Sequence, residues 1–349
     1  MTATPGPSKY ATVVPSMRVL KSKLVGRDRI RELVAQPSLE EALSLLKDTV
    51  YGEAIKSSDI RGIQRDLYRF YCRTIESIKK KAPKDIHPLL DAFKHEVEAG
   101  DIITLAIYSA ARAGEIPELV TGDIGECPAV TVAREPEALV SLQRYLEYLQ
   151  STWASKYADL LKRAAEGGDP SRIAWTRLAM VAGEYSRALE ELDPRLARPM
   201  AAKTLCPILD WTIAAFLVQA KKDGMEPRLI EEVLVDVPTC RFSVSNARTV
   251  YEREPGPEGL AGSIDDVVRT VRIDVSKDLV DALEEARIEA RKKSLSKAIA
   301  VYSSYPFHAG LVAAGLVMFK INLEDLLTVL TGIALRLDPE EYLPSTTLG

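Results

Sequence analysis

The dipeptide His95-Glu96 begins the H-E-x-x-H pattern, in which two histidines on one helical face bind zinc and the glutamate acts as general base. Position 99 is Ala99, so the second zinc ligand of that pattern is missing. The remaining histidines, His87 and His308, are isolated in the sequence and indicate no nucleophile pair. The histidines therefore predict neither a metal site nor an acid–base centre.

The aspartate pair Asp265-Asp266 is the second candidate for chemistry. All-helical enzymes of prenyl transfer bind a magnesium diphosphate through such pairs, and an enzyme of that class is one alternative for this chain. The next carboxylate, Asp274, is out of phase for a shared magnesium site, so we interpret the pair as helix-capping residues. No G-x-x-x-x-G-K-[ST] phosphate loop is present. We expect no catalytic residue, cofactor, metal or small-molecule substrate.

Composition limits the function further. The 349 residues have a formal charge of −4, so nothing in the chain as a whole indicates a nucleic-acid surface. A hydrophobic fraction of 46% is enough for a sizeable core. Asn and Gln are scarce while Glu, Lys and Arg are abundant, which is typical of thermophile proteins. The cysteines lie far apart without a C-x-x-C, which predicts reduced thiols in a cytosolic protein: Cys72, Cys127, Cys206 and Cys240.

The strongest pattern is a threefold repeat of an apolar helix followed by a corner. The copies cover residues 101–118, 210–228 and 325–341, and each begins with an aspartate that we expect to open its helix. Gly114 and Gly224 end the first two helices, whereas the third copy has no glycine there. Because a helix with one apolar face cannot bury that face alone, the three copies should pack together. A proline opens the helix after each corner: Pro117, Pro227 and Pro339.

A second pattern recurs ahead of these copies. Ser38 and Glu41 form a capping box, and we expect the helix that follows to run to Tyr51. A comparable helix is expected over 134–153, and a third version begins at Ser263. The sequence therefore predicts an all-α protein of three similar helical bundles, with minimal strand. Their expected bounds are residues 1–120 with a flexible N-terminal tail, 121–236 and 237–349.

Other segments have a simpler periodicity. Residues 59–81 predict a long amphipathic helix, and residues 273–297 predict a charged one. Residues 233–251 are mixed, and Phe242, Val244 and Val250 favour extended chain there.

The stretch 298–319 contains no charged residue and is long enough to span a bilayer. Pro306 lies near its middle, behind two serines. We therefore interpret it as two packed segments with a corner at Tyr305-Pro306, and we predict no transmembrane segment.

The N-terminal stretch is basic and supplies the candidate partner-binding residues. Val13, Met17 and Leu20 have helical spacing, and positive residues lie between and after them. Such charges usually form a solvated face; the alternative is a docking surface for an acidic partner. The candidate contact residues are Arg18, Lys21, Lys23 and, at the end of the first repeat, Arg112.

Segments along nearly the whole chain match the pattern of one known family. They are Tyr10 with Arg18, the helix from Ser38 to Tyr51, Asp101-Ile102-Ile103-Thr104-Leu105, and the C-terminal segment from Ala313 to Tyr342. On these residues the chain resembles the C subunit of the archaeal A-type ATPase, which is similar to the d subunit of eukaryotic V-type ATPases. Thr104 stands where Asn is common in the family, and the acidic pair usual near Met318 is absent.

The resemblance implies a funnel-shaped, non-catalytic rotor subunit with pseudo-threefold symmetry. Such a subunit links the shaft of the central stalk to the proteolipid ring, and it transmits torque between ATP turnover and proton or sodium ion transport. The implied partners are the shaft subunits and the ring. The implied location is peripheral, on the cytoplasmic face of an archaeal cell membrane. The alternative is a soluble helical-repeat scaffold that binds another partner.

Overall fold

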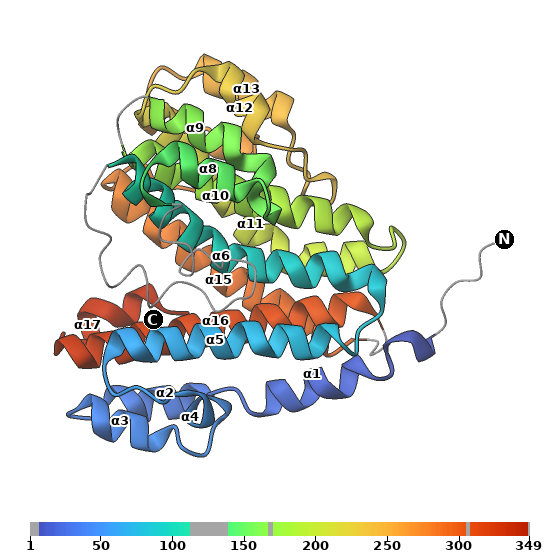
Figure 1. Ribbon diagram of the computed structural model, residues 1–349, viewed down its shortest axis with the longest axis vertical. Coiled ribbons are helices and arrows are strands. Elements are labelled where there is room, and N and C mark those ends of the chain that lie inside the picture. Colours follow the sequence, from blue (N-terminus) through green and yellow to red (C-terminus); the bar gives the residue numbers. More distant parts are fainter. Residues whose placement is uncertain (1–6, 112–138, 167–169, 305–307, 348–349) are drawn as a thin grey trace. The chain divides into compact units, whose positions relative to one another are not determined.

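The computed structural model describes residues 7–111, 139–166, 170–304 and 308–347, and this part of the chain is helical (Figure 1). Its only pairing of extended backbone is an isolated bridge between Val237 and Phe242. The prediction of an all-α protein is therefore confirmed. Phe242 takes part in that bridge, but Val244 and Val250 lie in a helix capped by Ser243, so the prediction of extended chain is wrong for these two residues. Strand preference is weak, and the cap decides the local structure.

The chain divides into two compact units. Unit 1 comprises Met1–Leu90, Leu189–Trp211 and Ser276–Gly349, and unit 2 comprises Asp91–Ala188 and Thr212–Val275. Unit 1 contains α1 (Val13–Ser22), α2 (Arg27–Val34), α3 (Leu39–Leu45), α4 (Val50–Ala54), α5 (Ile60–Lys79), α15 (Leu279–Tyr302), α16 (Ala309–Leu335) and α17 (Pro339–Tyr342). Unit 2 contains α8 (Leu142–Leu149), α9 (Ala158–Glu166), α12 (Pro227–Val233), α13 (Val244–Arg253) and α14 (Pro257–Gly262). Three helices contribute to both: α6 (His87–Ala110), α10 (Pro170–Glu191) and α11 (Ala197–Lys222).

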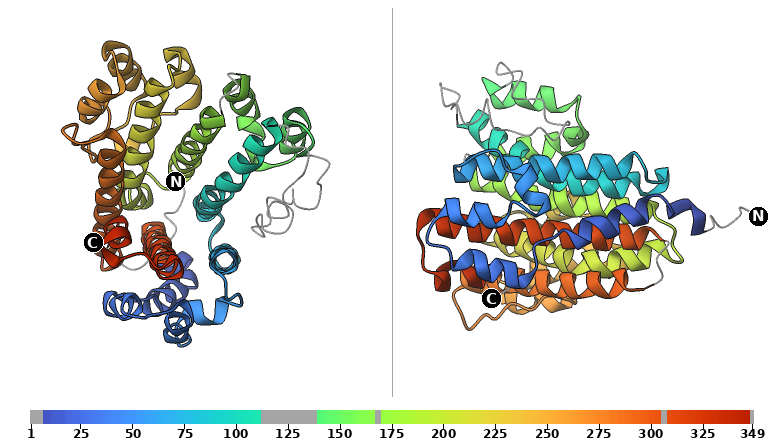
Figure 2. Two further views of the ribbon diagram at one scale, coloured as in Figure 1. Left: turned by 90° about the vertical axis from the view of Figure 1, so that its left-hand side faces the viewer. Right: turned by 90° about the horizontal axis from the view of Figure 1, so that it is seen from below.

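Helix α16 is the centre of unit 1. Its first three turns are apolar around the whole circumference and buried on every side, whereas Lys320, Glu324 and Thr328 in its second half are half-buried. Helices α15, α1, α2 and α5 pack against it, and both views of Figure 2 show α1 alongside it. Its Phe319 ring lies 5.1 Å from the Tyr71 ring centroid of α5 and 5.7 Å from that of Phe70. These ring contacts hold α5 against α16.

The corners that end two of the repeated helices are confirmed. Gly224 ends α11 with φ +66°, and Pro227 begins α12 directly after it. At the end of α16 the left-handed residue is Arg336, with φ 55°, and Pro339 begins α17. Arg336 therefore ends the third repeated helix in the left-handed conformation that Gly224 adopts at the end of the second. The corner of the first copy lies outside the described residues.

The expected starts of the repeated helices are wrong. Asp101, Asp210 and Asp325 lie in the interior of α6, α11 and α16 rather than at their first turns. An aspartate before an apolar run resembles an N-cap in the sequence, but here the residues ahead of it are helical too. Asp210 is 0% exposed and Asp325 is 3% exposed, so the repeated carboxyl is a buried group that needs partners.

Helix caps set several boundaries. The Ser38 hydroxyl accepts from the Glu41 N–H at 3.3 Å, which confirms that cap. The helix does not run on to Tyr51 as expected, because α3 ends at Leu45 and Thr49 caps α4 anew. Helix α15 begins at Leu279, later than predicted. The long amphipathic helix predicted over 59–81 is confirmed as α5.

The uncharged stretch 298–319 belongs to two helices, as predicted, because α15 ends at Tyr302 and α16 begins at Ala309. The corner itself lies outside the described residues, as does most of the expected N-terminal tail. In the described part of the chain, α11 is long and apolar enough to cross a membrane, but 83% of its apolar window is buried inside the protein. That burial is typical of a core helix.

The cysteines correct another expectation. Cys72, Cys206 and Cys240 are disulfide-bonded, and the described residues include no free thiol. The prediction of reduced thiols is therefore wrong; Cys127 lies outside the described residues. Separation along the sequence does not prevent approach in the fold. Intracellular proteins of hyperthermophiles are an exception to the rarity of cytosolic disulfides, which fits the thermophile-type composition.

A buried ion pair joins α15 to α16. Arg291 is 5% exposed, and its Nη2 donates to the Asp325 carboxylate at 3.0 Å and to the Glu324 carboxylate at 3.1 Å. The N–H of Thr347 donates to Asp325 Oδ1 at 3.2 Å, and the Thr347 hydroxyl donates to the other oxygen. Burial raises the pKa of Asp325, although Arg291 and Thr347 oppose that rise. The pair therefore also holds the C-terminal residues against α16.

Removal of Arg291 should destabilise the fold strongly. We expect Arg291→Met to lower the free energy of unfolding by about 3–5 kcal/mol, because Asp325 is left buried without its cation. The double variant Arg291→Met/Asp325→Leu should recover most of that loss, since no unpaired carboxylate remains. Chemical unfolding of the four members of this cycle measures the coupling. Strictly additive losses would show that the pair is not energetically linked.

Two glycines of unit 1 give a matched test of packing. A Cβ on Gly332 would lie 2.4 Å from the Tyr342 ring, whereas a Cβ on Gly26 would meet nothing within 4 Å. Gly332→Ala should therefore lower the free energy of unfolding by about 1–3 kcal/mol, because the buried ring of α17 must move. Gly26→Ala should change it by less than about 0.5 kcal/mol. Equal midpoints of thermal unfolding for the two variants would contradict this account.

Candidate partner-binding surface

The residues that suggested chemistry in the sequence do not form a catalytic constellation. Asp265 and Asp266 lie in a short turn of 3-10 helix (Ile264–Asp266) whose N-cap is Ser263, so their expected capping role is wrong. Asp266 instead accepts from Arg253 Nη2 at 3.2 Å. Across the described residues, no group of three or more His, Cys, Asp and Glu side chains is placed to hold a metal ion.

His95 belongs to a buried polar centre in unit 2. Its ring stacks on Trp153 with centroids 4.0 Å apart, and its Nδ1 lies 2.8 Å from Glu184 Oε2. The other Glu184 oxygen accepts from the Tyr157 hydroxyl and from Arg187, each at 2.8 Å. The carboxylate is thus surrounded by donors that hold α6 and α10 to each other within the unit. This arrangement is structural, because both carboxylate oxygens are already bonded.

Helix α1 presents the basic candidates to solvent. Its buried face consists of Val13, Val14, Met17 and Leu20 and packs on α16, where Met17 fits against Gly315. A Cβ on Gly315 would lie 2.3 Å from the Met17 side chain, so the two helices approach closely at this point. The outward side of the same helix exposes Arg18, Lys21 and Lys23. The structure therefore brings three of the four predicted contact residues together; Arg112 lies outside the described residues.

The end of α15 extends this surface. Lys21 Nζ lies 4.6 Å from the centroid of the Tyr302 ring, which is the geometry of a cation–π contact. Burial raises the pKa of the Tyr302 phenol, and the nearby Arg18 guanidinium lowers it in part. Val19 is 55% exposed and Ile299 is 47% exposed. We refer to the whole patch as the basic surface: Arg18, Val19, Lys21, Lys23, Lys292, Ile299 and Tyr302.

Reasoning from sequence found the α1 part of the basic surface and missed the α15 part. Lys21 and Tyr302 are far apart along the chain, so no local pattern links them. The one available signal was the run of positive residues in the second half of α15. The prediction of a single charged helix over 273–297 did not separate that run from the acidic first half.

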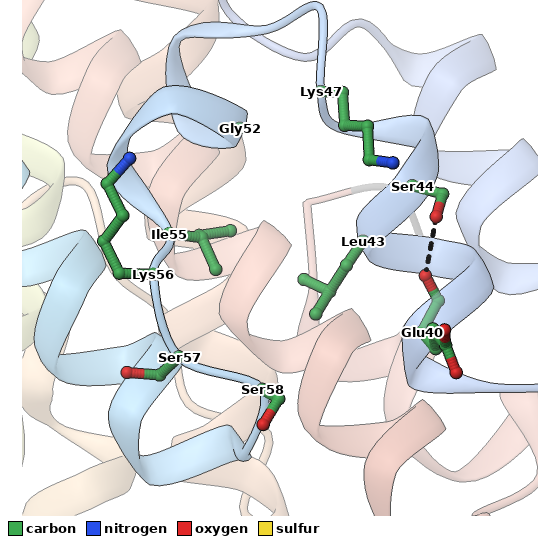
Figure 3. Close-up of a pocket in the computed structure, with 9 residues that line it drawn as sticks. All are labelled: Glu40, Leu43, Ser44, Lys47, Gly52, Ile55, Lys56, Ser57 and Ser58. Atoms are coloured by element: carbon green, nitrogen blue, oxygen red, sulfur yellow. Dashed lines mark hydrogen bonds between the residues drawn. The ribbon is translucent and has the colours of Figure 1, made fainter.

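A pocket of about 530 Å³ lies elsewhere in unit 1, between α3 and the segment that leads into α5. Leu43 and Ile55 point into it toward one another, and Lys47 and Lys56 stand on its walls (Figure 3). The Ser44 hydroxyl is occupied by a hydrogen bond to the Glu40 carbonyl at 3.1 Å. The lining contains one carboxylate and no histidine or cysteine, so it offers no acid–base or nucleophile pair.

Asp101 of unit 2 is a carboxyl whose pKa is strongly raised. Burial raises its pKa to about 7, the neighbouring Glu98 adds to the rise, and Arg177 opposes it. A carboxyl whose pKa is higher in the folded chain than in the unfolded chain favours the folded state at low pH. Its unfavourable contribution grows as the pH rises from about 3.8 to about 7.

Asp101→Asn should therefore stabilise the protein most above pH 7. The gain in free energy of unfolding should shrink as the pH falls below about 7 and vanish only below pH 3.8, where the wild-type carboxyl is protonated in both states. Urea unfolding across this range measures the difference. The exposed Asp159→Asn is the control and should show no comparable pH-dependent gain. A gain for Asp101→Asn that is independent of pH would contradict the assignment.

Comparison with known proteins gives a family match over nearly the whole chain. The family model described as "ATP synthase (C/AC39) subunit" matches residues 13–343, which is nearly the whole chain. A relative from Pyrococcus abyssi (strain GE5 / Orsay), named as the C subunit of an A-type ATP synthase, is 21% identical over 290 residues. That alignment covers 81% of this chain and 74% of the relative. The chain therefore belongs to the ATP synthase (C/AC39) subunit family.

Proposed function

We propose that this chain is a non-catalytic central-stalk subunit of an A-type or V-type ATPase. In this role it links the rotor shaft to the proteolipid ring and transmits torque between ATP turnover and the transport of protons or sodium ions. The observation that carries the proposal is the family match across residues 13–343. The relative named as the C subunit of an A-type ATP synthase supports an archaeal complex of this type. The protein would lie at the cytoplasmic face of the membrane as a peripheral component.

A threefold internal repeat is the second part of the proposal. We place three similar helical bundles at residues 1–120, 121–236 and 237–349, around a pseudo-threefold axis in a funnel. Two features support this organisation. Asp101, Asp210 and Asp325 occupy comparable interior positions in three long helices. The helices α11 and α16 also end in the same kind of corner, a left-handed residue followed by a helix that begins with proline.

Close packing suits a torque-transmitting role. The interior of unit 1 includes fully buried aromatic rings and glycine-mediated helix contacts, and such interiors have low compressibility. The exposed Arg18, Lys21 and Lys23 are the proposed contact residues on the described part of the chain, with Arg112 as the fourth. A contact that holds during rotation should bury a broad, partly apolar area, which the exposed Val19 and Ile299 could join.

Co-purification tests the function. The tagged full-length chain should recover both the shaft subunits and the proteolipid ring from detergent-solubilised membranes of a cell that expresses the whole ATPase. An unrelated tagged protein of the same size, purified in parallel, controls for non-specific capture. Recovery of neither partner would contradict the proposal and favour a helical-repeat scaffold with other partners.

A further inference from the structure

Charge is distributed unevenly along α15. Its first half, residues 279–290, contains four acidic residues and one arginine. Its second half, residues 291–302, contains four basic residues and no acidic one. The segments Met1–Arg27 and Ala290–Phe319 both lack Asp and Glu entirely, and α1 and the end of α15 come from these segments. The charges that these two segments contribute to the basic surface are therefore of a single sign, and acids next to these segments pair with their lysines, Asp85 with Lys9 and Glu289 with Lys293.

Exposed apolar side chains lie among these cations. On α15, Ile299 and Tyr302 are three residues apart and share a face, on which Lys292 is also exposed. On α1, Val19 lies between Arg18 and Lys23 on the solvent side. Lys21 bridges the two helices through its contact with the Tyr302 ring. Aliphatic, phenolic and cationic groups thus form one continuous exposed strip.

We infer that the basic surface contacts the anionic headgroups of a lipid bilayer. Positive side chains are attracted to anionic lipids, while exposed aliphatic and phenolic groups are suited to the boundary between headgroups and acyl chains. A protein partner would have to present a matching acidic patch, because interfaces place a positive patch against a negative one. Anionic headgroups supply a negative surface without a fixed register, and the apolar groups among the cations suit the boundary beneath them.

The contact is superficial. The apolar face of α1 is already buried against α16 through Val13, Met17 and Leu20, so the helix cannot turn that face into the bilayer. Only Val19 and Ile299 remain to reach below the headgroups. Binding should consequently be reversible, salt-dependent and mainly electrostatic.

This inference rests on the proposed function in one respect, since a protein that sits against the proteolipid ring lies close to the lipids around and within it. It adds an orientation that the family match does not give. The end of unit 1 that carries the basic surface faces the membrane, and the start of α15 faces away from it.

Vesicle binding by the purified full-length protein tests the inference. The protein should sediment with vesicles that contain phosphatidylglycerol and remain in solution with vesicles of phosphatidylcholine alone. Binding should fall as salt shortens the screening length. Lys21→Glu/Lys23→Glu should weaken binding by about 25-fold or more, because each cation near the surface contributes about fivefold to affinity.

A matched control separates a local contact from the effect of net charge. Lys47→Glu/Lys56→Glu changes the formal charge by the same amount, and both lysines are exposed on the wall of the pocket described above. We expect that variant to bind anionic vesicles within about twofold of wild type, because its lysines lie outside the strip. Val19→Ser/Ile299→Ser should weaken binding at high salt, where the apolar part of the contact remains. Unchanged unfolding midpoints show that each variant is folded.

Three outcomes would overturn the inference. They are equal binding to neutral and anionic vesicles, equal losses for the two lysine double variants, and no vesicle binding at all.

If no vesicle binding is found, loss of ATPase co-purification by Lys21→Glu/Lys23→Glu would show that the surface binds an acidic protein instead. The proposed function would then stand without the lipid contact. Vesicle binding together with failed co-purification would leave the lipid contact and end the proposed function.

Discussion

Burial of α16 is the constraint on which unit 1 depends. The first three turns of this helix are apolar on every side, and such a helix is stable in water only when neighbouring helices cover it. Helices α15, α1, α2 and α5 provide that cover, and Gly315 and Gly332 allow two of the contacts to be close. The one buried acid in its centre, Asp325, must be paired, and Arg291 of α15 pairs it. The ion pair consequently fixes the axial register of α15 against α16.

Unit 2 meets the same constraint differently. Asp101 occupies a similar interior position in α6, but the positive charge that faces it, Arg177, is exposed, and Glu98 adds a second buried negative charge. The carboxyl therefore accepts a proton near neutral pH instead of relying on a buried cation. Repetition in the sequence thus preserves the position of the acid but not its electrostatic environment.

Much of the helical architecture followed from local signals. Caps such as Ser38, the period of α5 and the proline after each described corner are determined by a few neighbouring residues, and each of these predictions was correct. Some errors follow from local caps that were overlooked, Thr49 ahead of Tyr51 and Ser243 ahead of Val244, and the others concern groups whose role depends on distant parts of the chain. A buried aspartate looked like an N-cap, and cysteines far apart in sequence proved to be bonded. The basic surface shows the same division, because the cations of α1 were predicted from the sequence and the contact between Lys21 and Tyr302 was not.

The fixed position of α15 explains why charge gathers at one end of unit 1. In its acidic half, Lys277 pairs with Glu285 and Arg287 pairs with Glu284, so part of the negative charge is neutralised locally. At the opposite end α1 adds further cations to those of α15, because Met17 and Gly315 hold it beside the start of α16. A close-packed interior transmits strain instead of absorbing it. The paired helices α15 and α16 therefore form a stiff connection between the two ends of unit 1.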